Sequence, residues 1–76
     1  MNNQRRKELS KAIELLEQAY SIVEDMMNEE QDCFDSLTEG LQQTMRGQQM
    51  EEAISAMESA SSSIEDAIAS IEDAQI

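Results

Sequence analysis

Apolar residues recur along this chain at alternating steps of four and three residues, in two separate runs. The first run has Glu30 at its one missing place and otherwise consists of Leu9, Ile13, Leu16, Tyr20, Val23, Met27, Phe34 and Leu37. The second run has the polar residues Ser61 and Gln75 at two of its places and otherwise consists of Met50, Ile54, Met57, Ile64, Ile68 and Ile71. This alternation is the heptad pattern of a coiled coil, in which the a and d positions face a partner helix. The pattern therefore predicts two long helices.

The heptad pattern breaks between the two runs. Ser36-Leu37-Thr38-Glu39 has the form of a capping box with Ser36 as the cap, and the only two glycines, Gly40 and Gly47, follow it. We expect one domain over residues 1–76, with a helix over about 4–35, a short helix over about 37–43 and a second long helix over about 47–75.

An antiparallel pairing of the two helices gives a consistent register. Setting Met27 against Met57 brings Phe34 to Met50 and places the middle of the turn at residue 42. The same register sets Val23 opposite Ser61, so the middle of the seam is its weakest part. The predicted fold is all-α: an antiparallel, coiled-coil-like helical hairpin with a short connecting helix.

A second apolar flank accompanies the first seam. Outside the a and d positions, the first helix carries Leu15 and Ile22 at c positions and Ala19 and Met26 at g positions. Cys33 occupies the next g position, where we interpret it as a small residue of the seam. A chain of 76 residues that buries one stripe per helix gains little net stability, and oligomerisation is one remedy. We therefore expect a homo-oligomer, either a dimeric four-helix bundle or a larger assembly. In an alternative interpretation, the flank binds a different protein.

The composition limits the chemistry that the chain can perform. It has no His, Trp or Pro, and its single Cys33 cannot form an intrachain disulfide. Zinc sites and di-iron Glu-x-x-His pairs both need residues that are missing. We therefore expect a protein that is not an enzyme and has no metal or cofactor. No apolar run predicts a membrane span, and the basic start does not lead into a signal-peptide core. A cytoplasmic location is the expectation.

Acidic residues dominate the charge: 17 Asp and Glu against five Lys and Arg give a net charge of −12. The second helix carries a ridge about 30 Å long, and its expected partner-binding residues are Glu51, Glu58, Glu65, Asp66, Glu72 and Asp73. Such a ridge either keeps a small bundle soluble or imitates the phosphates of nucleic acid and binds a protein with a basic surface. The same charge opposes direct nucleic-acid binding.

Four of the five basic residues lie in the first eleven positions: Arg5, Arg6, Lys7 and Lys11. In the hairpin they meet the acidic end of the second helix, so they compensate its charge and dipole. An alternative is an anion or nucleotide-phosphate site completed by Tyr20 in an oligomer, because arginine clusters bind phosphate well.

Three segments carry a resemblance to a family. They are Arg5-Arg6-Lys7-Glu8-Leu9, the central Glu29-Glu30-Gln31-Asp32 with Phe34-Asp35 and Leu37-x-Glu39-x-Leu41-Gln42, and Arg46-Gly47 with Met50-Glu51-Glu52-Ala53-Ile54. They resemble short acidic helical proteins encoded by bacteriophages and by integrative elements of bacteria. Where that family has Asn-Leu-Pro-Glu, this chain has Ser36-Leu37-Thr38-Glu39. The resemblance implies a setting, a bacterial host, rather than a mechanism.

These observations favour a binding protein over a catalyst. The leading hypothesis is a phage-encoded inhibitor of a host protein, anti-defence or regulatory, whose acidic helical surface acts as a DNA mimic. A second hypothesis is an oligomeric sponge that sequesters a nucleotide immune signal. A third is a purely structural, self-assembling coiled-coil protein.

Overall fold

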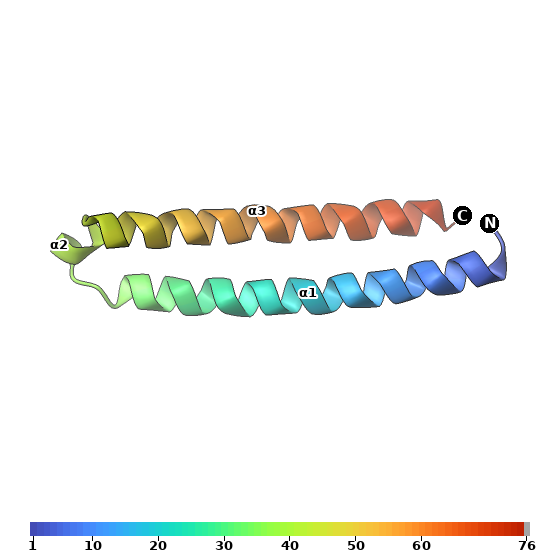
Figure 1. Cartoon of the computed structure of the whole chain (residues 1–76), viewed down its shortest axis with the longest axis horizontal. Coiled ribbons are helices and arrows are strands. Elements are labelled where there is room, and N and C mark those ends of the chain that lie inside the picture. Colours follow the sequence, from blue (N-terminus) through green and yellow to red (C-terminus); the bar gives the residue numbers. More distant parts are fainter. Residues whose placement is uncertain (76) are drawn as a thin grey trace.

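A computed structural model of the chain describes residues 1–75, which form three helices: α1 (Asn3–Asp35), α2 (Glu39–Gln42) and α3 (Met45–Ala74). The helices α1 and α3 lie side by side and run antiparallel, with both termini at one end and α2 at the other (Figure 1). The molecule is a rod of 58 × 14 × 12 Å, and the described residues contain no strand. The predicted helical hairpin is confirmed. Ile76, the last residue of the predicted domain, lies outside the described residues.

The seam between α1 and α3 follows the two heptad runs. Every member of both runs is buried or half-buried, including the polar members Glu30, Ser61 and Gln75. The most shielded side chains are Ile54, 8% exposed, and Ser61, 5% exposed. Among the described residues, each long helix packs along its length against the other long helix alone, so the rest of the seam stays half-open to solvent.

The short helix begins two residues later than the sequence predicts. Ser36 is not the cap of the short helix: its backbone is still helical, its N–H donates to the Asp32 carbonyl at 3.0 Å, and its hydroxyl donates to the same oxygen at 2.8 Å. Ser36 therefore closes α1. Thr38 adopts the extended conformation of an N-cap and accepts from the Leu41 N–H at 3.4 Å, so α2 is shorter than expected.

Contacts at the corner hold α2 between the long helices. The Gln42 side-chain amide donates to the carbonyl oxygens of Phe34 at 3.1 Å and Leu37 at 3.3 Å, at the C-terminal end of α1. Thr44 caps α3 and accepts from the Gly47 N–H at 3.4 Å, so α3 begins at Met45, earlier than expected. Gly47 is buried, and a Cβ there would overlap the Gln42 carbonyl oxygen. The chain can fold back this tightly because residue 47 has no side chain.

At the open end of the hairpin, Gln75 after α3 is hydrogen-bonded to the first turns of α1. The Gln75 side-chain amide donates to the Arg6 carbonyl at 3.3 Å and to the Ser10 hydroxyl at 3.4 Å. These contacts agree with the predicted register, in which Gln75 lies opposite Leu9. None of the helices within residues 1–75 combines the length and the apolar composition needed to cross a bilayer.

Candidate functional site

The two helices bring their e-position carboxylates to one edge of the hairpin. In an antiparallel pair, e positions flank the seam on one side and g positions flank it on the other. We call this side the acidic edge, and its carboxylates are Glu17, Glu24, Glu51, Glu58, Glu65 and Glu72. No Lys or Arg lies in residues 12–45 or 47–75, so no base alternates with these acids along either helix.

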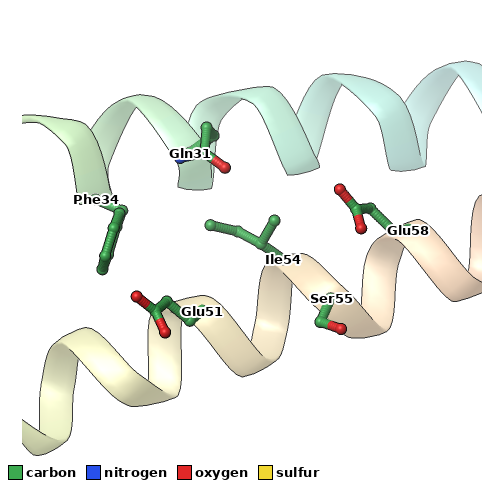
Figure 2. Close-up of a pocket in the computed structure, with 6 residues that line it drawn as sticks. All are labelled: Gln31, Phe34, Glu51, Ile54, Ser55 and Glu58. Carbon is green, nitrogen blue, oxygen red and sulfur yellow. The ribbon is translucent and has the colours of Figure 1, made fainter.

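A shallow groove of about 300 Å³ lies on the acidic edge near the corner. Its apolar floor comes from Phe34 on α1 and Ile54 on α3, and Gln31, Glu51, Ser55 and Glu58 complete its lining. Figure 2 shows Ile54 pointing from α3 toward α1, with the carboxylates of Glu51 and Glu58 on either side of it. The groove therefore offers a small apolar floor with negative charge at its rim.

A second groove of about 320 Å³ lies on the same edge toward the open end, lined by Glu17, Tyr20, Glu65 and Ile68. A hydrogen bond to the Glu65 carboxylate raises the pKa of the Tyr20 phenol to about 12, with desolvation and the negative charge of Glu24 adding to the shift. Because the neighbouring carboxylates oppose a tyrosinate, Tyr20 keeps its proton and acts as a donor.

The structure places all six predicted partner-binding acids at exposed positions. Glu51, Glu58, Glu65 and Glu72 belong to the acidic edge, whereas Asp66 and Asp73 stand at f positions and turn onto the outer face of α3. The expected partner-binding residues all come from α3, whereas α1 adds Glu17 and Glu24 to the same edge. These two belong there because e positions meet across an antiparallel pair.

Within one hairpin the predicted basic residues and Tyr20 lie apart, so an anion site that includes Tyr20 would need a second copy to complete it. We call Arg5, Arg6, Lys7 and Lys11 the basic end; all four are exposed in the first turns of α1. Lys7 and Lys11 share a surface hollow with Glu8 and Glu14, so acids alternate with the bases there. Tyr20 lies nine residues beyond Lys11, about 14 Å along the helix, and its hydroxyl is bonded to a carboxylate.

The flank of α1 away from the acidic edge carries the predicted oligomer interface. Leu15 is 60% exposed, Ile22 62% and Met26 47%, while Ala19 is half-buried. Cys33 is exposed as well, so its prediction as a small seam residue is wrong for the hairpin. A g residue lies beside the seam, and the slender hairpin leaves that flank open.

Within residues 1–75, no group of three or more His, Cys, Asp and Glu side chains is placed to hold a metal ion. Comparison of the chain with protein-family models, with curated proteins and with solved structures finds no match. The acidic edge and the apolar flank are the two surface features of the hairpin that suggest a function.

Proposed function

We propose that this chain is a non-enzymatic binding protein whose acidic edge occupies a basic groove on a partner protein. The observation that carries the proposal is the convergence of six carboxylates from two helices on one edge, with no base between them. An ordinary coiled coil alternates charge signs at its e and g flanks. Here the like charges cost stability within the hairpin, and a basic partner surface would relieve that cost.

The spacing of the carboxylates suits a surface made to receive nucleic acid. Along α3 the edge residues repeat every heptad, about 10.5 Å apart, and α1 supplies a second row beside them. A groove that binds phosphates presents Lys and Arg along its length, and a rod with two acidic rows would enter it as a nucleic-acid mimic. Complementary fields of this kind steer association and raise its rate.

The apolar floors of the two grooves add a feature that free nucleic acid lacks. Phe34 and Ile54 in one groove, and Ile68 in the other, lie between carboxylates. Lys and Arg side chains bind well at such places, because their aliphatic stems cover apolar surface while their charged ends meet the acids. The preferred partner is therefore a protein that projects Lys and Arg side chains from its groove. The role we propose for this binding is inhibition of such a host protein, anti-defence or regulatory.

The test separates the acidic edge from total charge. Wild type, Glu58→Gln/Glu65→Gln and the matched control Glu14→Gln/Asp25→Asn are immobilised and exposed to host lysate; both variants lose two negative charges. We expect wild type and the control to retain a basic, nucleic-acid-binding protein that a salt step or competing DNA releases, and the edge variant to lose it. Equal retention by both variants, or a wild-type bait that captures nothing, would contradict the proposal.

The nucleotide-sponge hypothesis gains nothing from the placement of the basic end. Glu8 and Glu14 lie beside Lys7 and Lys11, and the Tyr20 hydroxyl is already bonded to Glu65. The purely structural hypothesis predicts a wild-type bait that captures nothing, so the same experiment decides it.

A further inference from the structure

Leu15, Ala19, Ile22 and Met26 form a second stripe on α1, which we call the apolar stripe. Its steps of four, three and four residues repeat the spacing of the seam that packs on α3. Yet Leu15 and Ile22 are 60% and 62% exposed, and Met26 is 47% exposed. A run with coiled-coil spacing normally covers another helix. Among the described residues no helix covers it, so only a helix from outside the hairpin could.

We propose that a second copy of this chain covers the apolar stripe, with the two α1 helices antiparallel. The spacing fixes the register, because a-type and d-type positions form common layers in antiparallel pairs. Leu15 then packs against Met26 of the second copy, and Ala19 packs against Ile22 of the second copy. Each central layer sets a large side chain against a small or flexible one, which lets the helices interdigitate.

Charge complementarity selects this orientation over a parallel one. Residues 5–11 carry four bases and one acid, and the antiparallel register places them level with residues 30–36 of the second copy, which carry three acids and no base. An antiparallel pair lays the basic end of each copy beside the acidic stretch of the other. A parallel pair would place the two basic ends together and the two acidic stretches together, with repulsion along both.

The facing flank of α3 leaves room for the second hairpin. Its g and c positions repeat with the same three-and-four spacing and are all small: Ala53, Ala56, Ala60, Ser63, Ala67, Ser70 and Ala74. The two α3 helices can therefore approach closely while the larger α1 side chains fill the other half of a four-helix bundle. The acidic edges lie on the opposite sides of the helices, so they remain free for a partner. The dimer does not depend on the proposed function.

Spin labels on the native Cys33 allow the relative orientation of the two α1 helices to be measured without any mutation. In the antiparallel register, Cys33 of one copy lies level with position 8 of the other, so the two Cys33 residues are about 37 Å apart along the bundle. Nitroxide labels on Cys33, read by pulsed electron paramagnetic resonance of the full chain, should give a distance near that value. A short distance would establish a parallel pair, and a monomer in sedimentation would exclude any pair. Either result overturns the proposal.

Cross-linking provides a second, independent measurement. The thiol introduced by Glu8→Cys should form a disulfide with Cys33 of the second copy. Within one chain these positions are about 37 Å apart on the same helix, so any such bond joins two copies. The control Glu8→Cys/Cys33→Ser should give no covalent dimer. Cross-linking in the control, or none in Glu8→Cys, contradicts the register.

Ile22→Asp tests the stripe itself. A charge at the centre of the contact should weaken the dimer about tenfold or more, whereas Ser21→Asp, which adds the same charge one position away from the stripe, should leave it intact. Circular dichroism shows whether each variant is helical. Equal dimerisation of both variants overturns the proposal, and if Ile22→Asp unfolds, the Cys33 distance and the cross-link still decide it.

Discussion

The Tyr20 hydroxyl on α1 donates a hydrogen bond to the Glu65 carboxylate on α3, at the middle of the acidic edge. The contact joins the two long helices where Val23 and Ser61 make the neighbouring part of the seam weak. It also places the only tyrosine of the chain among carboxylates that oppose its ionisation. Tyr20 is therefore a built-in probe of the electrostatics of this edge.

The Tyr20 phenol should titrate at a higher pH in the folded chain than in the unfolded chain. Its pKa lies near 12 in the hairpin against an ordinary value of 10.0. Since the folded pKa is raised, the stabilisation is complete below pH 10 and is lost as the pH rises through 12. Tyrosinate absorbance should give a midpoint well above 10 in the folded chain, and Glu65→Gln should lower it. A folded wild type that titrates at 10 would contradict the hydrogen bond.

Alanine substitutions at the two glycines should have different effects on the free energy of unfolding. Gly47→Ala drives a Cβ into the backbone of Gln42 and should cost about 1–3 kcal/mol in the free energy of unfolding. Gly40 lies in α2, and a Cβ added there would meet no other atom within 4 Å, so Gly40→Ala should be neutral or stabilise by up to about 1 kcal/mol. Urea denaturation measures both, and equal midpoints would contradict the packing at the corner.

Ser61→Ala should stabilise the hairpin. Ser61 is 5% exposed, and its buried hydroxyl has no hydrogen-bond partner among the described residues. Removing an unpaired buried hydroxyl should raise the free energy of unfolding by about 1 kcal/mol. Ser62→Ala, at the exposed neighbouring position, is the matched control and should change little. A destabilised Ser61→Ala would show that the hydroxyl is in fact paired.

Salt should stabilise the protein. With a net charge of −12 and like charges facing across the acidic edge, screening removes more repulsion than attraction. The melting temperature should rise between low and moderate salt, and Glu58→Gln should raise it by about 2–4 °C at low salt, which corresponds to about 0.5 kcal/mol. A melting temperature that falls with salt would show that ion pairs dominate instead.

The spacing of apolar residues is sufficient to predict the hairpin and its register, because burial in a coiled coil depends on position in the heptad more than on residue type. That is why Glu30, Ser61 and Gln75 are shielded although they are polar. The prediction that Ser36 caps the short helix is wrong. Ser36 and Thr38 both have side chains suited to an N-cap, and the backbone conformation, helical at Ser36 and extended at Thr38, determines which of them caps α2.

The candidate site is predicted in part. The ridge on α3 is visible in the sequence, but its extension by Glu17 and Glu24 depends on which side of the seam each row flanks. The link between Tyr20 and the basic end rests on residue type alone, and helix geometry separates the two within one hairpin, so only a second copy could bring them together. Cys33 illustrates the same limit, since it is exposed although Ala19 at the same heptad position is half-buried, so the heptad position alone does not determine burial beside the seam.

The most direct test of the acidic edge is the dissociation constant for the captured partner, measured across a salt series with wild type, Glu58→Gln/Glu65→Gln and Glu14→Gln/Asp25→Asn. If the edge enters a basic groove, wild-type binding weakens steeply with salt, and the edge variant binds more weakly and with a shallower salt dependence than the control. Binding that salt leaves unchanged, or two variants that behave alike, would contradict the account.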